Sequence, residues 1–348
     1  MIIKKIEYKE LVKFTKKILY KTGLDKFSLN AVTTGLCEAS LRGVDSHGVR
    51  LLKHYSNSAI KGRKNNNPKM KFTKKFPALG VLDADDAFGH AAGFKAIDEG
   101  CKIANKYGIG SIIVNNSSHS GSMASMALKG ARKGFFVFAF THADSLMKTH
   151  GGKSAFFGTN PICFAAPRNK KEPYCLDMST TSISWNKLLN YNNLRKKLPY
   201  NLAGDKKGNP TIFPHLAKTL LPIGDYKGFG LASMIEILCG VQSGMKFGLN
   251  IPPMYTYPLN KKRKLSQFYI VMRTDGYLTK TNFFNSIDNL YKQLYKSESN
   301  KKTKIMMPND PEINTSIKRL KQGIPLDKEI FGSLMFLSKN FNIKLKTF

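Results

Sequence analysis

The chain has 348 residues, of which 42% are hydrophobic, and its formal net charge is +33. This length is ample for two domains, and the apolar fraction supports a packed core rather than a disordered chain. No apolar run approaches the ~20 residues of a membrane-spanning helix, and the early charges at Lys4 and Lys5 are not typical of a signal peptide. We therefore expect a globular protein without a membrane partner.

The positive charge raises the question of a nucleic-acid partner. Only nine of the 56 basic residues are arginines, and the lysines are scattered among Asn and Ile. Base recognition relies on arginine and aromatic side chains, and no known nucleic-acid-binding module is recognisable. Nucleic acid is therefore not the expected partner, although a catalytically degenerate, basic nucleic-acid-binding protein stays open as an alternative of another class. Five cysteines without CxxC spacing predict reduced thiols in a cytoplasmic protein, and no spacing is typical of a metal site.

Helical periodicity dominates residues 1–75, the predicted N-terminal segment. Apolar residues recur at helical spacing over 7–21, and a second helix is predicted from a Ser28 cap to Gly43. Residues 62–68 form a polar loop rich in Lys and Asn. Helical patterns return at 284–298 and 325–340, so we expect residues 284–348 to pack with the N-terminal segment.

Residues 76–283 alternate between the two periodicities. Strands are predicted near 80–83, 110–114 and 135–140, with helices at 90–107 and 123–132 between them. This order predicts an α/β domain with flanking helices around a central sheet. No strand is followed by G-x-G-x-x-G, so a Rossmann domain is not supported.

Two histidines at glycine-containing turns are the main candidates for chemistry. His47 lies in SHGVR (46–50) and His119 in SHSG (118–121). Imidazole exchanges protons near neutral pH. Arginine, here Arg50, commonly binds a carboxylate through two parallel hydrogen bonds. The pattern predicts proton transfer on a small carboxylate-bearing substrate. His90 and His215 lie outside these clusters and are expected to tolerate substitution.

Two polar turns are candidates for binding phosphate. Residues 177–181 (DMSTT) and Lys227-Gly228, which precede a helical stretch, combine glycine or hydroxyl residues with main-chain N–H groups. Such turns bind phosphate at helix starts, and Lys227 would add a point charge. Each turn could equally be only a turn.

The order of these motifs resembles the malate/L-lactate dehydrogenase family of the second, non-Rossmann type. The matching stretches lie at 41–55, 82–92, 115–121, 151–167, 176–187, 204–211, 220–232 and 307–313. The resemblance implies a family-specific α/β fold with a central mixed sheet, NAD or NADP as the cofactor, and a homodimer. It further implies hydride transfer between the nicotinamide and a small 2-hydroxy or 2-oxo acid. The closest branch is that of ureidoglycolate dehydrogenase, with malate, lactate and sulfolactate dehydrogenases as alternatives.

The resemblance also implies the roles of individual residues. His47 and His119 are the candidates for proton transfer, and Asp144 would fix an imidazole tautomer. The implied substrate-binding residues are Ser46, Arg50, Tyr55, Thr159, Asn160 and Arg263. The implied cofactor-binding residues are Asp177, Met178, Ser179, Thr180, Thr181, Lys227, Gly228, Pro308, Asn309 and Asp310.

Two departures from the family pattern stand out. The family arginine falls on Leu51, whereas this chain has Arg50, and one residue rotates a side chain by ~100° on a helix. Arg263 could replace it. The late Pro-Gly-Glu/Gln motif here reads Pro308-Asn309-Asp310, and losing its glycine is expected to change the loop.

Overall fold

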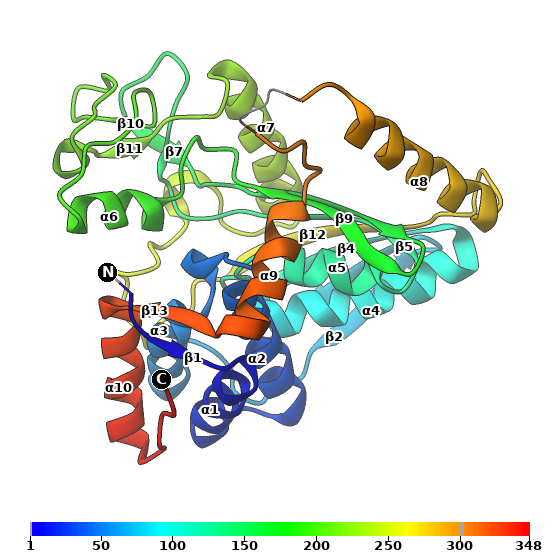
Figure 1. Ribbon diagram of the computed structural model, residues 1–348. Helices are drawn as coiled ribbons and strands as arrows, with labels where there is room; N and C mark the ends of the chain where they lie inside the picture. Colours follow the sequence, from blue (N-terminus) through cyan, green and yellow to red (C-terminus); the bar gives the residue numbers. More distant parts are fainter. Residues whose placement is uncertain (1, 300–302) are drawn as a thin grey trace.

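The computed structural model describes residues 2–299 and 303–348. The two ends of the described chain lie together (Figure 1): β1 (Ile2–Ile6) pairs antiparallel with β13 (Ile324–Asp327). Lys5 and Phe348 also exchange main-chain hydrogen bonds of 2.8 and 2.9 Å. The helices of this end region are α1 (Tyr8–Lys21), α2 (Lys26–Leu41), α3 (Leu52–Ile60), α9 (Asp310–Gln322) and α10 (Lys328–Phe341).

The central element is a seven-stranded sheet in the order β2-β3-β4-β12-β5-β8-β9. Strands β3 and β4 run parallel, and all other neighbours run antiparallel. The predicted mixed sheet is thereby confirmed, and its order differs from that of a doubly wound nucleotide-binding fold. The strands are β2 (Lys71–Phe76), β3 (Leu79–Asp83), β4 (Ile109–Ser117), β5 (Phe135–Thr141), β8 (Ile162–Arg168), β9 (Lys171–Met178) and β12 (Leu265–Arg273).

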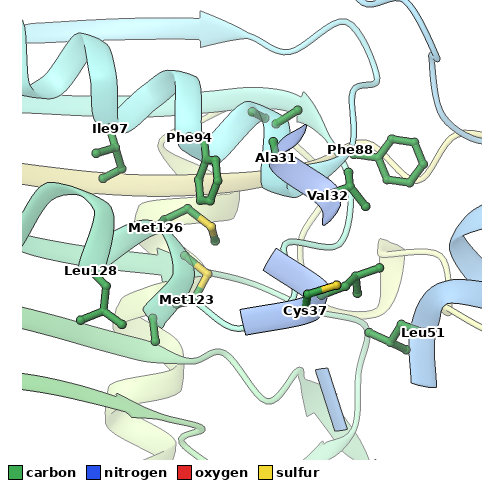
Figure 2. Packing of buried hydrophobic residues seen from close by; sticks show 14 of the residues in the cluster. Ala31, Val32, Cys37, Leu51, Phe88, Phe94, Ile97, Met123, Met126 and Leu128 are labelled. Atoms are coloured by element: carbon green, nitrogen blue, oxygen red, sulfur yellow. The ribbon is translucent and has the colours of Figure 1, made fainter. Parts of the chain in front are cut away.

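Helices α4 (Gly89–Tyr107) and α5 (Ala124–Ala131) bury their apolar faces against this sheet and against α2. Figure 2 shows Phe94, Ile97 and Met126 meeting in this core. A Cβ at Gly100 would lie 2.7 Å from the Val271 side chain, so this glycine lets α4 approach β12 closely. Helix α8 (Lys280–Lys296) instead packs on β8.

A small lobe stands beside the main sheet. It holds a second sheet in the order β10-β11-β6-β7 and its own apolar cluster, which includes Leu188, Leu198 and Leu220. Its elements are β6 (Met147–Lys148), β7 (Ala155–Phe157), α6 (Trp185–Asn193), β10 (Ala203–Gly204) and β11 (Thr219–Leu220). Helix α7 (Tyr226–Glu236) follows and continues as a π-helical turn, η4 (Ile237–Val241).

Some sequence predictions differ in detail. The cap of α2 is Asp25, whose carboxylate accepts from the N–H groups of Phe27 and Ser28, while Ser28 itself is buried in the first turn. Strand β2 begins the central sheet at residue 71. The domain boundaries at 75 and 283 stay predictions. Within the described residues, no helix is long and apolar enough to cross a membrane.

Candidate active site

His47 and His119 are brought together from segments about seventy residues apart. Their ring centroids are 5.8 Å apart, and the ring planes are inclined by 14°. Both rings line a cavity of about 290 Å³, whose wall also includes Thr159, Ser184, Trp185, Asn186, Met254 and Tyr255. Because two adjacent imidazolium ions would repel each other, this geometry favours no more than one proton-charged ring at a time.

Tyr55 orients the His119 ring. Its hydroxyl lies 2.7 Å from His119 Nδ1 and donates to the His119 carbonyl at 3.4 Å. Tyr55 is fully buried on α3, and burial raises its pKa, so the hydroxyl stays neutral. We infer that the hydroxyl proton goes to the carbonyl, that the hydroxyl oxygen accepts from Nδ1–H, and that Nε2 carries the free lone pair that a general base needs.

His47 has a different environment. Ser46 Oγ lies 3.0 Å from His47 Nδ1. Burial lowers the pKa of His47, and the nearby carboxylate of Asp177 opposes that shift. Burial also lowers the pKa of His119 well below its usual value, and nearby His47 and Lys64 act in the same direction. Of the two histidines, His119 is therefore the one more strongly favoured to be neutral before it accepts a proton.

Asp144 does not orient an imidazole. Its carboxylate forms an ion pair with Arg263 (2.5 Å) and accepts from the N–H of Met254 at 3.2 Å. Arg263 is itself buried, so the pairing is what makes its charge tolerable there. Tyr55 holds the imidazole instead, which corrects the expected role of Asp144. Asp144 still lines the cavity.

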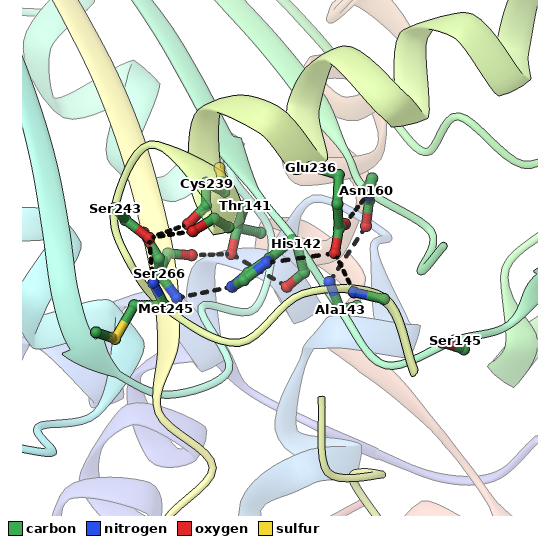
Figure 3. A network of polar contacts seen from close by, with 12 residues as sticks. Thr141, His142, Ala143, Ser145, Asn160, Glu236, Cys239, Ser243, Met245 and Ser266 are labelled. Atoms are coloured by element: carbon green, nitrogen blue, oxygen red, sulfur yellow. Dashed lines mark hydrogen bonds and ion pairs between the residues drawn. The ribbon is translucent and has the colours of Figure 1, made fainter. Parts of the chain in front are cut away.

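Asn160 belongs to a network of hydrogen bonds that joins residues 143–144 to α7 (Figure 3). Its side-chain oxygen accepts from Ala143 N, and its Nδ2 donates to the carbonyl of Ala232 and to Glu236 Oε2. It is fully buried, and both of its N–H donors are engaged. Asn160 ties the 143–144 loop to α7, and only Thr159 of the pair lines the cavity, so contact of Asn160 with a substrate is not supported.

Arg50 forms ion pairs away from the cavity. Its guanidinium forms ion pairs with Asp327 and Glu329, at the start of α10. Residues 49–51 form a short 3-10 turn, η2 (Val49–Leu51), which directs this side chain toward the C-terminal segment. The predicted carboxylate fork at Arg50 is therefore not supported, because two carboxylates already neutralise it.

The two predicted phosphate turns lie against each other. The carbonyl of Thr180 accepts from Ile223 N (2.9 Å), and Thr181 bridges to Pro222. A Cβ at Gly228 would lie 2.3 Å from the Ile223 carbonyl oxygen and 2.8 Å from that of Thr180, so glycine is required for this approach. The first turn of α7 has no acidic residue and carries the exposed Lys227, and the residue that caps the helix is Asp225. Phosphate binding at this helix start stays a prediction.

Other predicted cofactor residues have structural partners. Asp177 accepts from the Ser122 hydroxyl and Ala124 N. The hydroxyls of Ser179, Thr180 and Thr181 all donate to nearby main-chain carbonyls. Met178 ends β9, paired with Ile162.

The altered Pro308-Asn309-Asp310 motif keeps the left-handed backbone that a glycine would adopt. Asn309 has φ of 85°, a conformation that Asn tolerates better than most residues. Its buried amide accepts from Arg42 and donates to the carbonyl of Pro173. Asp310 accepts from Tyr295 and Met307. These contacts fasten α9 to β9, so the side chain of Asn309 is not available to a cofactor.

Sequence reasoning missed several residues of this site. Trp185, Asn186 and Tyr255 line the cavity, and Asn186 donates to the carbonyl of Ser46. The only signal for Trp185 and Asn186 was proximity to the 177–181 turn, and Tyr255 had none. Lys64, expected in a polar loop, is 4% exposed and bonds to Ser118. His90, expected to tolerate change, is fully buried, and Cβ atoms at Gly35 and Gly121 would lie 2.0 and 2.4 Å from its ring.

Two adjacent histidines that line one cavity are the arrangement expected of an enzyme that transfers protons. A family model described as malate/L-lactate dehydrogenase matches residues 6–335. The chain belongs to this family, which confirms the resemblance seen in the sequence.

Relatives match over most of their length. Ureidoglycolate dehydrogenase (NAD(+)) from Escherichia coli K12 is 32% identical over 289 residues, covering 83% of this chain and 80% of the relative. Malate dehydrogenase from Pyrococcus abyssi is 29% identical, covering 96% and 94%. The crystal structure of malate dehydrogenase from Entamoeba histolytica superposes with a TM-score of 0.92 at 25% identity, covering 98% and 99%.

Proposed function

We propose that the protein is an NAD-dependent dehydrogenase that oxidises a 2-hydroxy acid, or reduces the corresponding 2-oxo acid. The contact that carries this proposal is the 2.7 Å approach of Tyr55 to His119 Nδ1, which leaves Nε2 for the cavity. The names of relatives, among them a ureidoglycolate dehydrogenase that uses NAD(+), support the nicotinamide cofactor and the choice of NAD.

When bound, the nicotinamide supplies the hydride chemistry. The chain's own part is to move the hydroxyl proton and to position the substrate. His119 Nε2 accepts the proton of the substrate hydroxyl, and Tyr55 stabilises the resulting imidazolium by accepting from Nδ1–H. His47, stacked beside it, stays neutral during this step because a second cation would be repelled.

Among the substrates named for relatives, we propose ureidoglycolate. No lysine or arginine is among the described residues that line the cavity, while Thr159, Asn186 and Thr256 offer neutral hydrogen-bonding groups. A second anionic group, as in malate or sulfolactate, would lie in this cavity without a cation beside it, and an unpaired buried charge raises the free energy of binding. An uncharged ureido group fits such a wall better. We propose that the single carboxylate pairs with Arg263 by displacing its present partner Asp144, which lies at the cavity.

The experiment measures kcat/KM with NAD and NADP for ureidoglycolate, malate, lactate and sulfolactate. We expect ureidoglycolate with NAD to give the highest value. A higher value for malate or sulfolactate contradicts the proposed substrate, and no turnover of any acid contradicts the proposed activity.

Trp185, the only tryptophan, lines the cavity and reports on binding directly. NADH should quench its fluorescence. Quenching by duplex DNA that collapses with salt, without any response to NADH, would favour the nucleic-acid-binding alternative.

We further propose a cytoplasmic homodimer. The five cysteines are free and buried, as expected for reduced thiols. Met234, Ile237 and Val241 recur at helical spacing along α7 and η4 and are 38%, 55% and 54% exposed, which suits a face covered by a second copy. Light scattering coupled to gel filtration should give twice the 39.0 kDa chain mass, and Ile237→Asp should shift it toward the monomer.

A further inference from the structure

Lys64 is a buried lysine without an acidic partner. Its side chain is 4% exposed, and its Nζ donates to Ser118 Oγ at 2.8 Å. No carboxylate of the described residues lies within ion-pair distance of Lys64. Burial, together with the cations Arg263, Arg63 and Lys262, lowers the pKa of Lys64 well below its usual value. Burying an unpaired cation is expensive, so its position beside the proton-transfer residues calls for a physical reason.

The immediate contacts of Nζ act against this shift and suit an ammonium better than an amine. It lies 4.9 Å from the ring centroid of Tyr55 and 4.7 Å from that of Phe88. The Ser118 hydroxyl donates to the Ala87 carbonyl and accepts from Gly89 N, so toward Lys64 it can only accept. One N–H therefore goes to Ser118, and the others face aromatic π clouds. A neutral amine would turn its lone pair toward those electron-rich faces, which is repulsive.

This ammonium is linked to His119 in two ways. Ser118 directly precedes His119, and Tyr55, whose ring Lys64 covers, holds His119 Nδ1. A positive charge there disfavours protonation of the imidazole. The other titratable or charged groups around His119 and Lys64 are His47, His54, Tyr55, Arg63, His90, Asp144, Lys262 and Arg263, and the one carboxylate among them is already paired with Arg263.

We propose that Lys64 is a positioning residue that keeps the His119 imidazole unprotonated, so that Nε2 can accept the substrate proton. This inference rests on the proposed function for its role in turnover. Its electrostatic part is a property of the folded chain alone.

The test compares Lys64→Gln, which removes the charge but keeps a donor for Ser118, with Lys64→Arg, which keeps the charge. Lys74→Gln is the matched control, because Lys74 also covers an aromatic ring, that of Tyr107 at 4.6 Å, but is exposed. The pKa of His119 is read by NMR from its ring Cε1–H, and the pH dependence of kcat/KM for oxidation is measured in parallel.

We expect Lys64→Gln to raise the pKa of His119 by about one pH unit and to move the acid limb of kcat/KM up by the same amount. Lys64→Arg and Lys74→Gln should leave both near their wild-type positions. An unchanged pKa in Lys64→Gln, or an equal shift in Lys64→Arg, overturns the proposal, because a purely structural role would lower activity without moving the limb.

Two further results keep the outcome clear. If wild-type protein oxidises none of the acids, the proposed function fails, while the NMR titration still decides the role of Lys64. If Lys64→Gln does not fold, the Cε signal of Lys64 is titrated in the wild-type protein. The proposal requires Lys64 to lose its proton at a higher pH than His119, and the reverse order overturns it.

Discussion

The proton-transfer wall and the proposed cofactor wall are built by different means, and only the first lines the cavity. The proton-transfer wall consists of side chains that hold one another, with buried Tyr55 bonded to half-buried His119 and His119 stacked beside His47. The proposed cofactor wall consists of main chain, where the 177–181 turn meets residues 222–228 and the hydroxyls bond locally. The first wall depends on which side chains are present, and the second depends on the absence of one at Gly228.

The largest expected effect falls on the first wall. His119→Ala should lower kcat by about 10²–10⁴, the usual contribution of a general acid–base residue, with NADH binding nearly intact. His215→Ala is the control, because His215 is exposed on the small lobe. Steady-state kinetics with Trp185 titrations by NADH separate the two effects. Wild-type kcat in His119→Ala would remove His119 from the mechanism.

Gly228→Ala should break the second wall. The added Cβ would lie 2.3 Å from a main-chain oxygen, so the turn must open. Overpacking of this kind costs about 1–3 kcal/mol, which corresponds to a roughly five- to 150-fold weaker Kd for NADH. Gly230→Ala, two residues on, meets nothing within 4 Å and should bind normally. Equal affinities of the two variants by calorimetry would contradict the cradle.

The two arginines sharpen the contrast. Arg263→Lys should lower kcat/KM for the acid about tenfold or more, because lysine cannot reproduce the planar fork between Asp144 and the Pro252 carbonyl. Arg50→Lys should mainly lower Tm, since Arg50 fastens α10. Should Arg50→Lys alone reduce turnover, the substrate carboxylate binds at Arg50 after displacing its present partners.

A smaller effect is expected at Lys227. This lysine is exposed, so its attraction for a phosphate is screened by water and salt. Lys227→Ala should weaken NADH binding about two- to fivefold without changing kcat at saturation. Lys16→Ala on α1 serves as the charge-matched control. An unchanged Kd at low salt would move the phosphate away from α7.

A further effect concerns stability against acid. Burial lowers the pKa of His90 to about 3, whereas the unfolded side chain titrates near its usual value of about 6.5. Between these values the unfolded state binds the extra proton, so the stabilisation present above pH 6.5 is lost as the pH falls toward 3. His90→Gln should flatten this dependence by about 1.4 kcal/mol per pH unit within that window, measured by urea unfolding at pH 5 and 6. An unchanged slope would mean that His90 is protonated in the native state.

The sequence alone determined the α/β class, helices α1, α2, α4, α5, α8 and α10 and strands β3, β4 and β5 to within a few residues, and the choice of His47 and His119 as candidates. These follow from local periodicity and from residue types whose chemistry is intrinsic. Only the tertiary structure decided the pairings. Arg50 meets Asp327, nearly three hundred residues away, Asp144 meets Arg263 instead of a histidine, and Lys64 leaves its polar loop for the rings of Tyr55 and Phe88. A charged side chain takes its partner from whatever the fold brings beside it, and that neighbour is not encoded in the residues next to it along the chain.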